Sequence, residues 1–259
     1  MSARENESIE SAPVNLSKPG SGLDPDFFQE DLMQMTKAVN YLRWQVDLFK
    51  RYVSGNLLEI GGGIGNFTPA LSRQSESVVS IEPDPFCFKK LQEATSSLEN
   101  VTIHNVKAEQ LDDHIPSNYQ ADTVVCLNVL EHIEDDLAAV RLFQRRLHVG
   151  GTMILMVPAV EWLYGDIDKS VGHYRRYSRR GLRSLVLKAG LQIETLKYFN
   201  LVGLLGWLWN VKVAVKKKQS DSQILIFDRF IVPWLSVVEK FVPPLIGQSL
   251  LIVCKKVNP

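Results

Sequence analysis

The 259-residue sequence has few cysteines and no net charge. Its three cysteines, Cys87, Cys126 and Cys254, are too few and too scattered for a disulfide framework or a Cys-x-x-Cys metal site. Because Cys126 and Cys254 lie inside apolar stretches, we expect small buried core residues in a reducing compartment, which indicates a cytoplasmic protein. The pattern of His, Cys, Asp and Glu shows no metal-ligand cluster, so we expect a metal-independent protein.

Long hydrophobic runs are also missing. The longest apolar stretch, 198–215, is interrupted by Asn200, Asn210 and Lys212. A membrane-spanning helix needs about 20 nearly uncharged residues, so this stretch is expected to be buried or to lie at an interface. The first ten residues lack the basic start and apolar segment of a secretory leader, and we expect none. Residues 1–24 are rich in Ser, Glu, Asn, Pro and Gly and are expected to form a flexible tail.

The 29 basic and 29 acidic side chains balance, but they are unevenly distributed. Residues 1–168 carry 13 basic and 25 acidic side chains, whereas residues 169–218 carry 12 basic side chains and only Glu194. These two segments therefore have net charges of −12 and +11, and residues 219–259 add +1. The neutral total excludes no partner, and the basic segment favours an anionic or membrane-borne one.

Strand-like and helix-like segments alternate from residue 56 onwards. The expected strands are 56–60, 77–81, 101–106, 122–127, 152–157, 191–199 and an apolar strand within 247–256, with helices at 67–73, 85–98, 135–147 and 178–189. Continuously apolar strands predict a parallel sheet that is buried on both faces. We therefore expect an α/β fold in one domain, 25–259, with a helical cap at 25–53. A hydrophobic helical insert at 200–246 is expected before the last strand, with an apolar helix broken near Pro233.

A glycine-rich turn follows the first expected strand, in the sequence Leu57-Leu58-Glu59-Ile60-Gly61-Gly62-Gly63-Ile64-Gly65. A dinucleotide-binding G-x-G-x-x-G fingerprint would require a glycine where Asn66 stands, which argues against a nicotinamide oxidoreductase. Such a turn still lets a ligand approach the backbone beside a helix N-terminus.

Glu-x-Gly-x-Gly-x-Gly resembles motif I of the class I S-adenosylmethionine-dependent methyltransferases. The resemblance implies a Rossmann-like, mostly parallel seven-stranded sheet with helices on both faces and a reversed β-hairpin at its end. It implies S-adenosyl-L-methionine as cofactor, with the glycines near its methionine part and an acidic side chain orienting the loop. The residues so assigned are Glu59, Gly61, Gly63 and Gly65.

The ends of the following strands extend the resemblance. Glu82 stands where this family binds the ribose, although an ordinary helix N-cap cluster with Asp84 is the alternative. Ala108 and Glu109 match the adenine turn more loosely, and a turn without a ligand remains open. Leu127-Asn128-Val129-Leu130-Glu131-His132 resembles the fourth motif of small-molecule and lipid methyltransferases, which places Asn128 and Val129 at the cofactor. Glu131 and His132 are both able to do acid–base work, although orienting the loop is the commoner role there, and His132 is the candidate catalytic residue of the two.

A block of polar residues, 163–168 and 172–178, follows the fifth strand and should lie in the ligand crevice. We call it the polar block. It resembles a subgroup of bacterial methyltransferases with an Asp and a Gly-His-x-Arg-Arg-Tyr segment. His173 is a candidate general base that Asp168 would orient, and Arg175 and Arg176 are candidates for clamping an anion. The alternative is that both arginines pair with acidic groups while His173 and Tyr177 fix the loop. The residues assigned to the acceptor are Tyr41, Tyr174, Arg175, Arg176 and Tyr177.

The insert begins with a helix near 201–209 that is apolar nearly all round and is followed by Lys212 and Lys216–Lys218. A substrate lid, peripheral membrane contact through 198–218, and plain packing on the sheet all remain open.

These patterns predict a methyltransferase that O-methylates a small-molecule or lipid-like acceptor with an anionic group. One alternative is an RNA methyltransferase using the basic segment, although the Asn/Asp-Pro-Pro-aromatic motif of nucleic-acid amino-methyltransferases is absent, and a nucleic-acid partner is therefore disfavoured. The other alternative is a non-catalytic interaction protein that keeps the fold.

Overall fold

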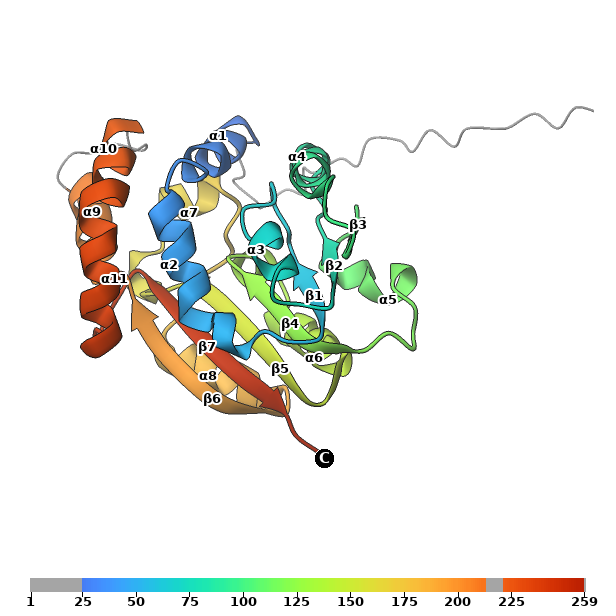
Figure 1. The fold of residues 1–259 in the computed structure, drawn as a ribbon. Coiled ribbons are helices and arrows are strands. Elements are labelled where there is room, and N and C mark those ends of the chain that lie inside the picture. Colours follow the sequence, from blue (N-terminus) through green and yellow to red (C-terminus); the bar gives the residue numbers. More distant parts are fainter. Residues whose placement is uncertain (1–24, 213–220, 259) are drawn as a thin grey trace, which may run out of the picture.

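A computed structural model describes residues 25–212 and 221–258 of the chain. The expected tail at 1–24 and the lysines at 216–218 lie outside these described residues. A seven-stranded sheet forms the centre of the molecule, with strand order β3-β2-β1-β4-β5-β7-β6 (Figure 1). The strands are β1 (Asn56–Ile60), β2 (Ser77–Ile81), β3 (Val101–His104), β4 (Ala121–Leu127), β5 (Leu147–Pro158), β6 (Leu191–Phe199) and β7 (Ser249–Lys256).

The first five strands in the chain pair in parallel, and β7 runs antiparallel between β5 and β6. This confirms the predicted parallel sheet with a reversed hairpin at its end. Burial explains the parallel part, because every β4 residue except Asp122 is fully enclosed or nearly so. A strand covered on both faces needs a continuous apolar run, and that is the pattern that predicted it.

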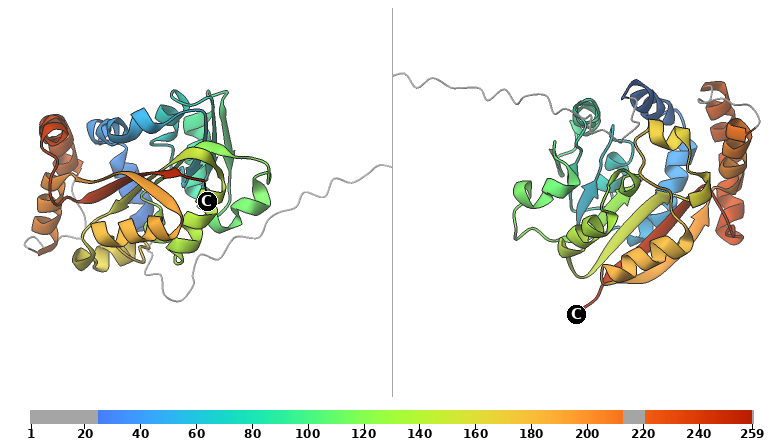
Figure 2. Two further views of the ribbon diagram at one scale, coloured as in Figure 1. Left: turned by 90° about the horizontal axis from the view of Figure 1, so that it is seen from below. Right: turned by 180° about the vertical axis from the view of Figure 1, so that it is seen from behind.

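Helices cover both faces of the sheet. One face packs against α2 (Val39–Phe49), α3 (Thr68–Ser72) and the C-terminal helices, whereas α6 (Asp136–Arg145) and α8 (Arg179–Lys188) cover the other. Figure 2 shows α6 and α8 in front of the sheet when the molecule is seen from behind. The remaining helices are α1 (Pro25–Met35), α4 (Pro85–Thr95), α5 (Leu111–His114), α7 (Asp166–Ser170), α9 (Leu201–Lys212), α10 (Asp221–Ile226) and α11 (Val232–Phe241).

Three helices begin at side chains that the sequence supplies locally. Asp84 accepts a hydrogen bond from the backbone N–H of Cys87, Asp135 does so from Ala138, and Ser178 from Gly181. Each side chain satisfies a backbone N–H that has no partner within its helix. The predicted N-cap at Ser178 is thereby confirmed.

The structure differs from the expectation near Pro233. The helix is not broken there, because a π-helical turn, Phe227–Ile231, joins α10 to α11 and Pro233 lies in the first turn of α11. Proline lacks an N–H and is tolerated in a first helical turn. The π-helical turn before Pro233 lets the helix continue without the hydrogen bond that Pro233 cannot donate. Two short helices, α5 and α7, were not predicted.

The strand order reverses between β1 and β4, whose carboxyl ends lead into the glycine turn and the 128–133 loop. Ligands of open α/β sheets bind outside this point of reversal. The fold therefore places the candidate cofactor loop and the candidate acceptor loop at one edge of the sheet.

Candidate active site

The glycine turn is held against β2, because the backbone N–H groups of Gly61 and Gly62 both donate to the carbonyl of Ile81. A Cβ atom on Gly61 would collide with Val129, one on Gly62 with Ser80, and one on Gly65 with Ala94. A Cβ atom on Gly63 would meet nothing within 4 Å, although its φ of +57° also favours glycine. Three glycines thus serve packing, and Gly63 faces the open side where a ligand can approach the backbone.

Glu59 lies beneath this turn and does not reach its open side. Its carboxylate is buried and accepts hydrogen bonds from the hydroxyl groups of Thr68 (2.7 Å) and Ser80 (2.6 Å). Burial raises the pKa of Glu59, and the two hydrogen bonds oppose that shift. The arrangement fits a carboxylate that orients the loop, as the resemblance implies.

Glu82 ends β2 and faces the glycine turn. Its Oε2 accepts a hydrogen bond from the N–H of Gly63 (2.8 Å), and its Oε1 accepts one from Asp84 (2.9 Å). Burial raises the pKa of Glu82 to about 7. Each carboxylate oxygen keeps a second lone pair, which a ribose hydroxyl can use. Asp84 caps α4 as the alternative reading supposed, and Glu82 remains available to a ligand.

The other predicted cofactor residues lie at the same edge of the sheet. Ala108 is buried at the start of a 3₁₀ turn after β3, and Glu109 beside it is exposed. Asn128 adopts a left-handed φ of 54°, and its N–H donates to the carbonyl of Met156 on β5. Val129 lies against Gly61. Together with the open position of Gly63, these residues fit a nucleoside cofactor such as S-adenosylmethionine.

A buried polar cluster lies where the 128–133 loop meets the polar block after β5. Nδ1 of His173 lies 2.9 Å from Oδ1 of Asp168, and Nε2 of His173 lies 3.8 Å from Oε1 of Glu131. The rings of His132 and His173 meet edge to face at 4.7 Å between centroids. The predicted pair of His173 and Asp168 is therefore in hydrogen-bond contact, and His132 is beside it.

Glu131, which was considered for acid–base work but not assigned to the site, lies at the centre of this cluster. Its side chain is buried, and Oε2 has no hydrogen-bond partner among the described residues. Burial raises the pKa of Glu131 to about 7, although the charge of His173 opposes that shift. A buried carboxylate oxygen without a partner is costly and marks a place for a ligand group. The signal was present in the Leu-Glu-His part of the fourth motif.

The pKa values of His132 and Asp168, which lie near Glu131, are both lowered, but for different reasons. Burial and the nearby His173 lower the pKa of His132 to about 3, so its imidazole is neutral. Burial alone would raise the pKa of Asp168, but the hydrogen bond to His173 and the charge of Arg176 outweigh it and keep that pKa below its ordinary value. Asp168 is therefore a buried carboxylate anion that holds one nitrogen of His173.

The ligand atoms of Glu131, His132 and His173 all lie within 4.8 Å of one another, a grouping that is able to hold a metal ion. The sequence does not reveal this cluster, because two of the residues lie on one loop and the third lies on a distant one. The hydrogen bond of His173 Nδ1 to Asp168 leaves the other nitrogen of His173 facing the cluster, which suits either proton transfer or ligation.

The two candidate anion-clamping arginines have internal partners. Arg176 is buried, donates to Oδ1 of Asp168 (2.8 Å) and lies over the ring of Trp207 at 4.4 Å. Arg175 is partly exposed and forms an ion pair with Asp136 at 3.0 Å. The carboxylate of Asp136 also accepts a hydrogen bond from the hydroxyl of Tyr177. The pairing with acidic groups that the sequence analysis offered as its alternative is thus present.

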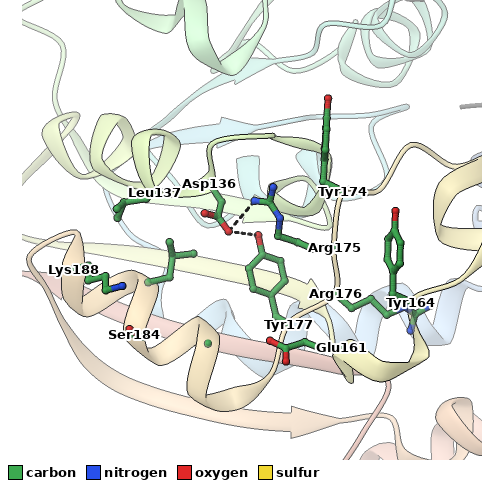
Figure 3. Close-up of a pocket in the computed structure, with 12 residues that line it drawn as sticks. Asp136, Leu137, Glu161, Tyr164, Tyr174, Arg175, Arg176, Tyr177, Ser184 and Lys188 are labelled. Carbon is green, nitrogen blue, oxygen red and sulfur yellow. Dashed lines mark hydrogen bonds and ion pairs between the residues drawn. The ribbon is translucent and has the colours of Figure 1, made fainter. Parts of the chain in front are cut away.

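A pocket of about 680 Å³ opens beside these residues. Figure 3 shows Arg175 and Tyr177 pointing toward Asp136, with Tyr174 and Tyr164 at one side and Lys188 at the other. The glycine turn does not line this pocket, so the pocket adjoins the polar block and is separate from the cofactor loop. Tyr174, Arg175, Arg176 and Tyr177 thus share one pocket wall.

Tyr41 lies apart from that pocket. It lies on α2 and is buried against the start of α9, where its hydroxyl is 3.3 Å from Nδ2 of Asn200. Burial raises the pKa of Tyr41 to about 12. The contacts of Tyr41 are those of a core residue that joins the cap to the insert.

The insert packs on the body through α9. Leu204 is buried, Trp207 and Leu208 pack against the core, and Leu205 is exposed. Packing on the sheet therefore describes this part of 198–218, while residues 213–218 lie outside the described chain. No helix in the described residues is both long enough and apolar enough to cross a membrane.

The family comparison decides between the classes of protein that this geometry allows. Residues 34–196 match the family model of a methyltransferase domain. The chain belongs to the methyltransferase domain family. This membership confirms the predicted family and the predicted Rossmann-like fold, and it agrees with S-adenosylmethionine as the cofactor that the glycine turn and Glu82 would hold. The match does not test the finer subgroup with the Gly-His-x-Arg-Arg-Tyr segment.

Curated relatives of the methyltransferase domain share a description. A ubiquinone biosynthesis O-methyltransferase of Pseudomonas aeruginosa strain LESB58 is 30% identical over 153 residues, which cover 53% of this chain and 65% of the relative. One of Xanthomonas campestris pv. campestris strain B100 is 25% identical over 176 residues, covering 62% and 71%. The match thus spans just under two thirds of the Pseudomonas protein.

Solved structures agree on the fold. The N-methyltransferase NodS of Bradyrhizobium japonicum WM9, in complex with S-adenosyl-L-homocysteine, aligns with a TM-score of 0.52 at 15% identity, covering 91% of this chain and 90% of that one. An S-adenosylmethionine-dependent methyltransferase of Mesorhizobium loti aligns with a TM-score of 0.53 at 16% identity, covering 79% and 92%.

Proposed function

We propose that the protein is an S-adenosylmethionine-dependent methyltransferase that O-methylates a small-molecule or lipid-like acceptor carrying an anionic group. The observation that carries the proposal is the His173–Asp168 pair beside the unpartnered carboxylate oxygen of Glu131. The names of the curated relatives support transfer to oxygen.

The cofactor supplies an electrophilic methyl group on a sulfonium. The backbone at Gly63 would admit it, while the close packing of Gly61 and Gly65 shapes the turn and Glu59 orients it from below. Glu82 would accept hydrogen bonds from the ribose hydroxyls, Ala108 and Glu109 would flank the base, and Asn128 and Val129 would close the other side of the turn. Methyl transfer then needs the acceptor oxygen held in line, which is the main contribution of the protein.

His173 takes the proton of the acceptor hydroxyl. In the tautomer that donates Nδ1–H to Asp168, the imidazole would present an unprotonated Nε2 toward Glu131. The unpartnered Oε2 of Glu131 offers the acceptor hydroxyl a hydrogen-bond partner. Asp168 and Arg176 are positioning residues, because they fix His173 through buried contacts. His132 is neutral and packs edge-on against His173.

The anionic group of the acceptor is proposed to lie in the pocket of Figure 3. Arg175 there is the partly exposed arginine, and its pairing with Asp136 holds it in place. Tyr174 and Tyr177 give the same wall an aromatic surface. Tyr41 is proposed to affect acceptor binding indirectly, because its contact with Asn200 holds α2 against the start of α9.

Proton transfer by His173 requires no metal. Dialysis against a chelator should therefore leave the methylation rate unchanged. Loss of activity that is restored by a divalent cation would instead make Glu131, His132 and His173 a metal site and would contradict the proton-acceptor role.

The acceptor class is tested by incubating cell extracts with isotopically labelled S-adenosylmethionine and the purified protein. Mass spectrometry is expected to find the label on the oxygen of a small or lipid-extractable anionic molecule. Label in RNA would establish the RNA methyltransferase alternative, and label nowhere would establish the non-catalytic one.

A further inference from the structure

The helical segment from α10 to α11 has two opposite stripes of side chains. Along the inner stripe, Ile224, Asp228, Val232, Leu235 and Glu239 are buried at helical spacing. Along the outer stripe, which we call the outer apolar face, Ile226, Phe230, Trp234, Val237 and Phe241 recur at the same spacing and are exposed. An amphipathic helix normally points its apolar side inward, so the exposed outer apolar face indicates a binding surface.

The inner stripe fixes this segment rigidly to the body. Asp228 accepts hydrogen bonds from the backbone N–H groups of Asn40 (3.1 Å) and Tyr41 (2.8 Å) at the start of α2. Glu239 does the same for Asn200 (2.8 Å) and Leu201 (2.9 Å) at the start of α9. Both carboxylates therefore serve as caps for other helices, and the segment cannot turn its apolar side inward without losing them.

The outer apolar face is extensive and rich in aromatic rings. Trp234 is 77% exposed, Phe241 is 76% exposed and Phe230 is 68% exposed. Leu245, just beyond α11, is 92% exposed and continues the face. Aromatic and aliphatic side chains of this kind insert into the boundary between lipid headgroups and acyl chains.

The exposed charges within residues 222–246 have one sign. Between residues 222 and 246 the exposed ionisable side chains are Arg229 and Lys240, whereas both carboxylates, Asp228 and Glu239, are buried. Arginine and lysine beside an apolar helix face are attracted to anionic headgroups, and an exposed carboxylate would be repelled by them. This complementarity favours an anionic bilayer surface as the partner of the outer apolar face.

The position of the segment connects it to the acceptor side of the site. Ser249, at the start of β7, pairs both with Pro158 at the carboxyl end of β5 and with Phe199 at the end of β6. The helical segment therefore joins the sheet where the polar block begins, and in Figure 1 it stands along the edge of the molecule beside α2 and α9. A lipid-like acceptor would reach the polar block from this side.

We propose that the outer apolar face docks the protein on an anionic lipid bilayer. It places membrane contact in residues 225–246, not in the stretch 198–218 that the sequence analysis considered. It deepens the proposed function by giving a membrane-borne acceptor a route to the site, and its test is independent of catalysis.

The test uses the full chain and vesicles of phosphatidylcholine, with or without about a third phosphatidylglycerol. Sedimentation should show binding to the anionic vesicles, and the double variant Trp234→Ser/Phe241→Ser should weaken it by roughly tenfold or more. The charge-reversed variant Arg229→Glu/Lys240→Glu should weaken binding to anionic vesicles by a similar factor and leave weak binding to neutral ones unchanged. The matched control is Val149→Ser, since Val149 is 56% exposed and lies near the amino end of β5, at the opposite end from the strand terminus that joins this segment.

Thermal unfolding and S-adenosylhomocysteine titration of each variant should match the wild type, which separates this proposal from the proposed function. Absence of vesicle binding by the wild type would overturn the proposal, as would binding that survives the double substitution. A dimer in solution that the double substitution dissociates, without vesicle binding, would show that the face is a subunit interface and would also overturn it.

Discussion

At the scale of single residues, the polar cluster combines groups with opposite electrostatic preferences. Glu131 is favoured in its protonated form by burial, whereas Asp168 remains a carboxylate because His173 and Arg176 surround it. The surroundings thereby shift the pKa values of two carboxyl groups near one imidazole in opposite directions, an arrangement that favours acid–base chemistry.

The variant His173→Ala should lower turnover about a hundredfold or more, because the proton acceptor is removed. Affinity for S-adenosylhomocysteine should be unchanged, because His173 lies in the polar cluster and not at the glycine turn. The exposed His148, near the amino end of β5, provides the control variant His148→Ala. Full activity of His173→Ala would show that this histidine only fixes the loop.

The raised pKa of Glu131 predicts that the free energy of unfolding depends on pH. Its pKa in the folded protein, about 7, is above its ordinary value, so its contribution to stability is present at low pH and is lost as pH rises through about 7. The unfolding free energy of the wild type should therefore fall between pH 5 and pH 8 relative to Glu131→Gln, by about 3 kcal/mol. Thermal or urea unfolding at both pH values measures this difference. Parallel pH profiles for the wild type and Glu131→Gln, as expected for the exposed control Glu99→Gln, would contradict it.

At the scale of elements, the strands were predictable and several helix boundaries were not. Apolar runs such as 124–127 allow few alternatives, because a strand covered on both faces is apolar over most of its length. The cap of α2 comes from Asp228, which is distant in the sequence, while the local N-cap residue Ala38 makes no side-chain hydrogen bond. No local pattern contains such a contact, and α5 and α7 are too short to show a helical period.

The variant Asp228→Asn tests this remote cap. An amide has one acceptor oxygen in place of two, so one backbone N–H at the start of α2 would lose its partner. The unfolding free energy should fall by about 1–3 kcal/mol in urea titration. Asp47→Asn, at an exposed i,i+3 pair with Lys50, should change it by no more than about 0.5 kcal/mol. Equal stability of Asp228→Asn and the wild type would show that the contact does not act as a cap.

At the scale of the whole molecule, the charge segregation seen in the sequence has a partly internal explanation. Arg175 and Arg176 of the basic segment pair with Asp136 and Asp168 of the acidic one, so these four charges cancel within the fold. The cofactor side of the site was predictable, because glycines and acidic residues at strand ends carry a local signature. The acceptor side was predictable only as a set of residues, since the approach of Glu131 to His173 joins two distant loops.

The central claim is that the turn around Gly63 binds S-adenosylmethionine, and calorimetric titration with S-adenosylhomocysteine tests it most directly. The wild type should bind one equivalent, and Gly63→Arg should abolish binding because its side chain would fill the open side of the turn. Gly190→Arg is the matched control, since Gly190 also has a positive φ of +78° and open space but lies in the turn between α8 and β6. Binding lost in Gly63→Arg and kept in Gly190→Arg would bear out the claim, whereas a wild type that does not bind, or unchanged affinity in Gly63→Arg, would contradict it.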